Sequence, residues 1–225
     1  MEPIISIITP TTGKKSVFNL INSIKEQKIP VRHIILFDNK RDKDFCYNFV
    51  EVNEEFYSTN NIVINGSFVQ GKACGSALRA VGLMIANTEY TTFADDDVLW
   101  ECGHLQSLID ALKNQNKKWG FCKRKIWTQL PDGQYEYLGV DNFESVGDEA
   151  KTPYKMVDNN CMIFQRRFGT SAACLYRETQ DYNDDRLMYD FLTKYAGEPA
   201  KTNIASVNQV CPNKLVEFFR RGCTI

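Results

Sequence analysis

The first hundred residues of the chain alternate between short apolar runs and stretches whose apolar residues recur at helical spacing. The apolar runs, each about as long as one buried strand, lie at residues 4–8, 33–37, 61–64 and 90–94. Helical stripes lie after the first and third of these runs, at residues 17–24 and 77–85. Strands that are apolar on both sides are typical of a parallel sheet covered by helices on both faces, because neither face then meets water. The alternation therefore predicts an α/β fold built on a mostly parallel sheet.

The second half of the chain is richer in aromatic and β-branched residues. A helical stripe at residues 105–112 precedes a predicted hairpin at residues 119–140, whose centre reads Pro-Asp-Gly-Gln. A further helix is predicted at residues 187–195, and no internal repeat or low-complexity linker interrupts the sequence. We therefore expect one domain spanning residues 1–225, with a parallel half up to about residue 100 and a smaller mixed β region after it.

Charge and composition exclude several classes of protein. The chain has 27 basic and 28 acidic residues and a formal net charge of −1, whereas proteins that coat nucleic acid are normally clearly basic. The run Lys123-Arg124-Lys125 is more typical of a solvated strand face than of a binding site. No apolar stretch approaches the roughly 20 residues that cross a bilayer, and none of the eight cysteines forms a C-x-x-C pair. We therefore expect no nucleic-acid partner, no transmembrane segment, and a cytoplasmic protein that is either free or peripheral to a membrane.

Three consecutive carboxylates, Asp95-Asp96-Asp97, follow the apolar run at residues 90–94. Such charges repel one another at the end of a buried strand and are costly without a nearby cation. In an extended backbone Asp95 and Asp97 project to the same side, and their oxygens suit Mg²⁺ or Mn²⁺ bridged to phosphates. The alternatives are a solvated acidic turn or a helix cap before Val98. The motif predicts a Mn²⁺ or Mg²⁺ site.

Thr9 and Asp38 occupy the same kind of position, just past the ends of predicted strands. Open α/β sheets bind ligands beyond the carboxyl ends of their strands. Together with residues 95–97, these side chains bring hydroxyl and carboxylate groups to one edge of the sheet, where we expect a ligand. Asp38 could instead be a simple turn residue before Asn39.

The order of these motifs resembles glycosyltransferase family 2. Residues 5–11, Ile-Ser-Ile-Ile-Thr-Pro-Thr, are similar to the opening strand of that family, and residues 34–38, Ile-Ile-Leu-Phe-Asp, to its second strand. Residues 75–97 resemble the longest shared block, in which a helix with an Ala-x-Arg motif leads to an Asp-x-Asp motif. Thr170–Arg177 is similar to the strand before the acceptor-side acidic motif, and Asn183–Leu187 to that motif itself. The ordered set is more specific than any one of its motifs.

The resemblance, which spans residues 4–195, implies a GT-A type fold. This is a Rossmann-like, mostly parallel sheet with helices on both faces and a smaller mixed β region on the acceptor side. It divides the domain into a nucleotide-binding half, about residues 1–100, and an acceptor-side half, about residues 101–225. The residues that it assigns to nucleotide binding are Thr9, Asp38, Arg79, Asp95 and Asp96. It assigns Asp97 and Asp95 to the metal, Asp185 to the catalytic base, and Asp184 and Thr170 to the acceptor side.

The function implied by the resemblance is that of a metal-dependent, inverting glycosyltransferase that moves a hexosyl group. The donor would be a nucleoside-diphosphate sugar, and the acceptor a hydroxyl of a glycan, lipid-linked or protein-linked molecule. Asp185 would take the proton of that hydroxyl, and Mn²⁺ or Mg²⁺ would stabilise the departing diphosphate. UDP is the expected nucleotide, because Asp38 suits a pyrimidine edge and family 2 commonly uses UDP-sugars.

For several of these residues, a purely structural role is the alternative to a functional one. Arg79 could be a solvated helix arginine, and Asp184 and Asp185 could cap a helix that starts near Leu187. Two other functions also stay open. One is a sugar nucleotidyltransferase, which shares the general fold, although residues 10–15 poorly match its Gly-rich loop. The other is a non-catalytic nucleotide- or carbohydrate-binding module.

Overall fold

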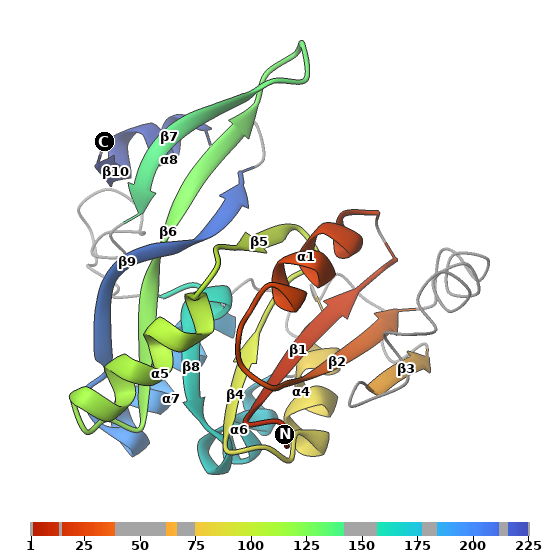
Figure 1. The fold of residues 1–225 in the computed structure, drawn as a ribbon, viewed down its shortest axis with the longest axis vertical. Helices are drawn as coiled ribbons and strands as arrows, with labels where there is room; N and C mark the ends of the chain where they lie inside the picture. The colour runs from red at the N-terminus through yellow and green to blue at the C-terminus, as the bar shows by residue number, and fades with distance from the viewer. Residues whose placement is uncertain are drawn as a thin grey trace.

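The computed structural model describes residues 2–13, 15–38, 62–66, 75–141, 157–176, 184–211 and 216–224. Within these ranges the strands form one ten-stranded sheet with the main path β10-β7-β6-β8-β4-β1-β2-β3, which β9 and β5 join through β6. Figure 1 shows helices on both faces of the sheet and a β6–β7 hairpin that projects from one end. The predicted α/β fold is confirmed.

The parallel part of the sheet is made by the four apolar runs of the first hundred residues. They form β1 (Ile5–Thr11), β2 (Val31–Asp38), β3 (Ile62–Gly66) and β4 (Tyr90–Phe93). These strands are parallel in the order β4-β1-β2-β3. All seven residues of β1 are buried, as a strand covered on both faces requires. The carboxyl ends of these strands meet at one edge of the sheet, which we call the rim.

Helices from different parts of the chain cover the two faces. α1 (Ser16–Lys25) and α5 (His104–Asn114) lie on one face, and α4 (Ser76–Ile85), α6 (Arg166–Ala172) and α7 (Asp184–Ala196) lie on the other (Figure 1). α4 approaches β1 closely, because a Cβ on Gly82 would come within 2.4 Å of Ile8 Cγ2. At the start of the same helix, a Cβ on Gly75 would lie 2.8 Å from Pro10 Cβ. The first turn of α4 is therefore held beside the rim.

β8 (Met162–Gln165) joins the parallel part of the sheet to the rest. It is antiparallel to β4 and to β6 (Trp119–Gln129). β6 also pairs with β7 (Tyr135–Asp141), which confirms the predicted hairpin, and with β9 (Ala200–Val210). The mixed β region is therefore continuous with the parallel sheet. The remaining elements are β5 (Val98–Trp100), the 3-10 turn η1 (Asn159–Cys161), α8 (Val216–Gly222) and β10 (Cys223–Thr224).

The strand expected at Thr170–Arg177 is wrong. The described part of this segment completes α6 and continues as the 3-10 turn η2 (Ala173–Leu175). Gly169 and Ala172 are buried, a spacing of three residues that suits one face of a helix and not one face of a strand. A Cβ on Gly169 would lie 2.7 Å from Phe164 Cε2, so the glycine lets α6 pack directly against β8.

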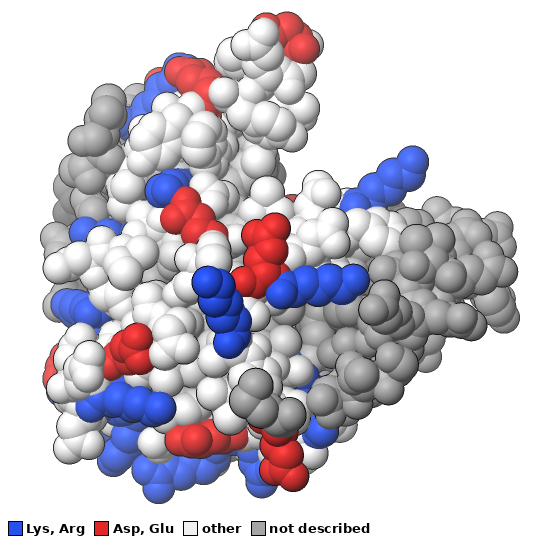
Figure 2. All heavy atoms as spheres, in the orientation of Figure 1, with Lys and Arg blue, Asp and Glu red and all other residues white. Residues whose placement is uncertain are grey.

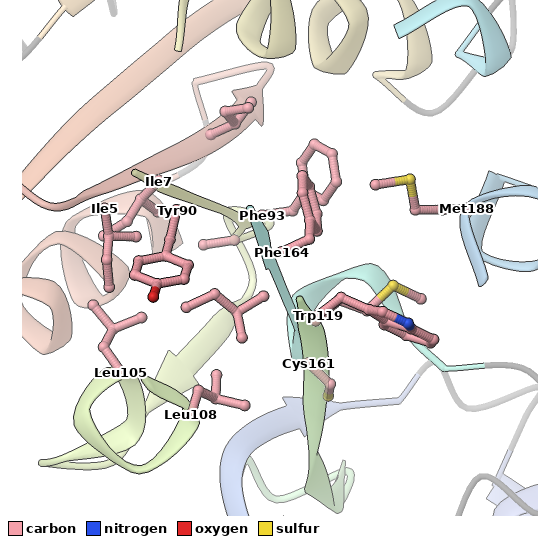
Figure 3. Close-up of a cluster of buried hydrophobic side chains, with 14 of the residues drawn as sticks. Ile5, Ile7, Tyr90, Phe93, Leu105, Leu108, Trp119, Cys161, Phe164 and Met188 are labelled. Atoms are coloured by element: carbon pink, nitrogen blue, oxygen red, sulfur yellow. The ribbon is translucent and has the colours of Figure 1, made fainter. Parts of the chain in front are cut away.

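The hydrophobic core lies between the sheet and its helices (Figure 3). Large side chains from both halves of the chain meet there, among them Ile5, Ile7, Tyr90, Phe93, Leu105, Leu108, Trp119, Phe164 and Met188. The ring of Phe93 lies 5.8 Å from that of Phe164 and 5.5 Å from that of Tyr176, between centroids. Because Phe93 is the last residue of β4, this packing fixes the strand end from which the acidic motif begins.

The surface carries a mixture of charges. Acidic and basic side chains are interspersed on the face shown in Figure 2, in keeping with a net charge of −1. The cysteines that the structure describes as free are Cys102, Cys122, Cys161, Cys174 and Cys211. Among the described helices, none is both long enough and apolar enough to cross a membrane.

Candidate functional site

Asp95-Asp96-Asp97 form a turn at the rim, between β4 and β5. The N–H of Val98 donates to the carbonyl of Asp95 at 3.3 Å, so the segment is not extended and that expectation is wrong. Asp96 is only 6% exposed and accepts a hydrogen bond from Thr11 Oγ1 at 2.6 Å. Asp97, in contrast, is exposed. The three carboxylates therefore lie in different surroundings.

Arg79 of α4 pairs with the first of these carboxylates. Its Nη2 contacts Asp95 Oδ1, and the exposed fraction of the side chain is 8% for Arg79 and 28% for Asp95. The alternative of a solvated arginine is therefore wrong. Burial opposes the charge on Arg79, but attraction to Asp95, Tyr176 and Asp185 together outweighs it, so the pKa of Arg79 lies above its usual value. A fixed positive charge thus lies beside the acidic turn.

The acidic pair Asp184-Asp185 begins α7 and lies close to the same arginine. Asp184 Oδ2 accepts a hydrogen bond from Ser76 Oγ and is 4.0 Å from Arg79 Nη1. Asp185 Oδ1 accepts a hydrogen bond from the backbone N–H of Asn159 at 3.2 Å. Both carboxylates are in the first turn of α7, where the helix dipole favours negative charge. The fold therefore brings the second acidic motif to the first, and the pair also starts a helix.

Asp185 has a strongly perturbed pKa. Burial raises the pKa of this carboxyl group from 3.8 to about 8, and the charges of Asp158 and Asp95 add to the rise, while Arg79 and Arg124 oppose it. Burial therefore favours the protonated form of this carboxyl group. A pKa near the working pH is typical of a group that accepts or donates a proton in catalysis.

Asn160 is a site residue that the sequence did not reveal. It is 1% exposed, and its side chain forms two hydrogen bonds with Asp95. Oδ1 accepts from the backbone N–H of Asp95 at 2.6 Å, and Nδ2 donates to Asp95 Oδ2 at 3.0 Å. Its partner is 65 positions away in the chain, and no local pattern in the sequence marks such a contact.

Arg124 of β6 is a second residue that sequence reasoning missed. It is 4% exposed, donates from Nε and Nη2 to Asp141 Oδ2 at 2.9 and 2.7 Å, and contacts Asp158 Oδ2 through Nη1. The interpretation of residues 123–125 as a solvated strand face is therefore wrong for Arg124. β6 alternates between buried and half-buried positions, and Arg124 falls in the buried register, two positions from an apolar residue on either side. That period of two was the signal that could have found it.

The position expected for Thr9 is wrong. β1 continues to Thr11, so Thr9 lies inside the strand with no exposed surface. The Thr9 hydroxyl and His33 Nε2 are hydrogen-bonded at 2.8 Å, and burial lowers the pKa of His33 to about 3, so the ring is neutral. Thr11 is the residue that brings a hydroxyl to the rim.

The remaining predicted site residues are Asp38 and Thr170. Asp38 is the last residue of β2 and is therefore at the rim, but its side chain lies outside the described part of the chain. Thr170 is exposed on α6, and its hydroxyl donates to the carbonyl of Arg166 at 3.4 Å. The structure thus groups Arg79, Asp95, Asp96, Asp184 and Asp185, but not Thr9 or Thr170.

The acidic turn fits a divalent cation in part. Asp95 already has Arg79 on Oδ1 and Asn160 on Oδ2, whereas Asp97 is exposed. Across the described ranges, no group of three or more His, Cys, Asp or Glu side chains is arranged to hold a metal. Mg²⁺, however, usually needs only one or two carboxylates when substrate phosphates and water supply the other ligands. Asp97 is therefore the residue of this turn that fits such an ion.

Most of the chain matches one known family. The sequence model described as Glycosyl transferase family 2 matches residues 6–170. The chain belongs to glycosyl transferase family 2. The family 2 match runs from β1 into α6, so it contains Arg79, the acidic turn and Asn160, and it ends before Asp184. No curated protein matches the chain by sequence.

Solved structures of S. aureus TarS have a similar fold. Residues 1–349 of TarS are 17% identical with a TM-score of 0.66, over 100% of this chain and 67% of that one. The same fragment with UDP gives 16% identity and a TM-score of 0.68, over 100% and 67%. Its complex with UDP-GlcNAc gives 18% and 0.67, over 95% and 59%. A longer TarS chain is covered over only 37% of its length. This likeness and family 2 membership confirm the GT-A type fold.

Proposed function

We propose that this family 2 protein transfers a sugar from a nucleoside-diphosphate sugar, with UDP as the nucleotide, to an acceptor hydroxyl. The observation that carries the proposal is that the ion pair of buried Arg79 with Asp95 lies close to the Asp184-Asp185 start of α7, at the rim. The rim is the edge at which open α/β sheets bind ligands. Crystal structures of TarS with UDP-GlcNAc and with UDP, on a similar fold, support a UDP-sugar as the donor.

On the donor side, the acidic turn and Arg79 would receive the nucleotide diphosphate. Asp97, exposed at the turn, would hold Mn²⁺ or Mg²⁺ against the phosphates, and Asp38 at the end of β2 would contact the base. The cation supplies neutralisation of the charge that develops as the sugar–phosphate bond breaks. Arg79 keeps the Asp95 carboxylate in place, and Asp96 fixes the end of β1 through the Thr11 hydroxyl.

On the acceptor side, Asp185 would be the base of an inverting hexosyl transfer. As the acceptor oxygen attacks the anomeric carbon, the bond from that carbon to the phosphate oxygen breaks, and the hydroxyl proton passes to the carboxylate. The N–H of Asn159 holds Asp185 Oδ1, so we assign the proton transfer to Oδ2. Asp184, held by Ser76 near Arg79, would orient the acceptor.

We propose a hydroxyl of a glycan, lipid-linked or protein-linked acceptor, and a cytoplasmic protein that is free or peripheral to a membrane. Family 2 membership favours sugar transfer over sugar nucleotidyl transfer. A binding module without catalysis would hold UDP but would release none from UDP-GlcNAc.

Thermal unfolding with UDP, in the presence and absence of Mn²⁺, tests the donor side, and release of UDP from UDP-GlcNAc tests the chemistry. UDP at about 100 times its Kd should stabilise the wild type by about 2.7 kcal/mol, mainly when Mn²⁺ is present. Asp97→Ala should lose the Mn²⁺-dependent part. Asp110→Ala, at an exposed position on α5, is the matched control and should keep it. Unchanged Mn²⁺-dependent stabilisation in Asp97→Ala would remove that residue from the metal site, and no UDP binding by the wild type would sink the donor assignment.

A further inference from the structure

The segment Asp158-Asn159-Asn160 lies between the two acidic motifs and is hydrogen-bonded to both. Asn160 Nδ2 donates to Asp95 Oδ2 at 3.0 Å, and the backbone N–H of Asn159 donates to Asp185 Oδ1 at 3.2 Å. All three residues of the segment are buried. A single short turn therefore touches the carboxylate that we place on the donor side and the one that we place on the acceptor side.

The orientation of the Asn160 amide follows from the chemistry of its neighbours. Oδ1 faces a donor, the backbone N–H of Asp95, at 2.6 Å. Nδ2 faces two acceptors, Asp95 Oδ2 at 3.0 Å and Asp158 Oδ1 at 2.7 Å. The reversed amide would set its oxygen against two carboxylates, which have no hydrogen to donate when ionised. Asn160 thus uses both hydrogens and the oxygen of its amide, and aspartate, although nearly the same shape, could not replace it.

The turn is itself fixed to the sheet. Asp158 Oδ1 accepts from the backbone N–H of Asn160 at 2.9 Å, and Asp158 Oδ2 contacts Arg124 Nη1. Arg124 is in turn held by Asp141 at 2.7 Å. On the other side of the turn, the Tyr176 hydroxyl donates to Asn159 Oδ1 at 3.1 Å. The chain of contacts from β6 to Asp95 is buried until it reaches Asp95, whose side chain is 28% exposed at the rim.

We propose that Asn160 is a positioning residue for sugar transfer, which holds Asp95 at a fixed place relative to Asp185. The inference rests on the proposed function, because it gives these two carboxylates their donor-side and acceptor-side roles. Asn160 acts through its contacts with Asp95 and Asp158, since it is 1% exposed and offers no surface to a substrate. Small displacements of groups that surround the reacting atoms cost large factors in rate, and supporting partners of such groups typically contribute about 10–100-fold.

The kinetic test compares Asn160→Asp with the wild type in UDP release from UDP-GlcNAc with Mn²⁺. Asn87→Asp is the control, because it makes the same change at an exposed position before β4, at the edge opposite the rim. We expect kcat of Asn160→Asp to fall by about 10–100-fold with KM within about 3-fold, because Arg79 still keeps Asp95 at the rim. The control should match the wild type. A kcat within about 2-fold of the wild type, in protein shown to be folded by its melting curve, would overturn the proposal.

A stability cycle tests the contact without any activity. It compares the urea midpoints of Asn160→Ala, Asp95→Ala and the double variant with that of the wild type. This cycle can still test the proposal if Asn160→Asp folds too poorly for kinetics. Residues that share a hydrogen bond are coupled, so the double shift should be clearly smaller than the sum of the single shifts. Additive shifts would overturn the inference that Asn160 holds Asp95 in place. If the shifts are coupled but the wild type neither binds UDP nor releases it from UDP-GlcNAc, the proposed function fails and Asn160 is only a structural bridge.

Discussion

Replacing Asp185 with asparagine should make the protein more stable and less active at the same time. In the folded protein the pKa of Asp185 is about 8 against an ordinary value of 3.8. Between these pH values the folded state keeps a proton that the unfolded state has released. The free energy of unfolding of the wild type therefore falls as pH rises through this window, whereas a neutral asparagine has no such dependence.

The size of the effect follows from the same values. Each pH unit between 3.8 and about 8 lowers the stability of the wild type, relative to Asp185→Asn, by up to about 1.4 kcal/mol. Because Asp185 is partly exposed, solvent reduces this, and we expect the variant to be more stable by about 1–3 kcal/mol above pH 8. Below pH 4 the two proteins should have nearly equal stability.

Urea unfolding at several pH values from 4 to 9 measures this difference. Asp190→Asn, an exposed position on the same helix, is the control and should show little change with pH. In UDP release or sugar transfer, kcat/KM of the wild type should rise with pH to a plateau above about 8, and Asp185→Asn should lose at least about 100-fold. A stability difference that does not vary with pH would refute the electrostatic reasoning. Full activity of Asp185→Asn with loss in Asp184→Asn would move the base to the neighbouring residue.

Three further changes test other parts of the site. Asp38→Ala should weaken UDP binding by about 1–3 kcal/mol with little change in unfolding, and calorimetry showing equal affinity of the wild type for all four nucleoside diphosphates would contradict this. Arg79→Ala should destabilise the protein by about 2–4 kcal/mol in urea, because Asp95 loses its buried partner; a loss below about 0.5 kcal/mol would mean that the pair is solvated. Gly82→Ala should cost about 1–3 kcal/mol, since its Cβ would lie 2.4 Å from Ile8 Cγ2, and a rise in melting temperature would show that the helix preference for alanine wins.

The sequence predicted the parallel strands well, because burial on both faces leaves a continuous apolar run. The apolar run ended at Ile8 and left Thr9 outside the strand, whereas the segment similar to the opening strand of family 2 continued to Thr11, where β1 ends. In the structure the carbonyl of Ile8 accepts from the N–H of Ala94 on the β4 side, so Pro10, two residues on, turns its nitrogen to the same side. The pairing with β4 has ended at Ile8 by then, while β1 continues beside β2 to Thr11. A missing N–H therefore costs the strand nothing at that position.

The candidate site was only half visible in the sequence for a different reason. Runs of adjacent acidic residues, as in Asp95–Asp97 and Asp184-Asp185, are recognisable in a sequence as candidate site residues. Asn160 and Arg124 lie within short polar runs of the mixed β half, and their partners Asp95 and Asp158 are 65 and 34 positions away in the chain. Contacts of this kind depend on the order of strands in the sheet, with β8 between β4 and β6, which no local pattern specifies.

The place of β8 in the sheet has a consequence for biosynthesis. Before β8 (Met162–Gln165) has been synthesised, β4 can pair with β1 on one side, but its other edge has no partner strand. All four parallel strands have been synthesised by that point. An open strand edge of this kind readily pairs with other chains. A nascent chain that stalls before residue 162, or a fragment cut to the first hundred residues as a nucleotide-binding unit, should therefore aggregate. The parallel half of the sheet therefore needs β8, four residues from the second half of the chain, to cover its open edge.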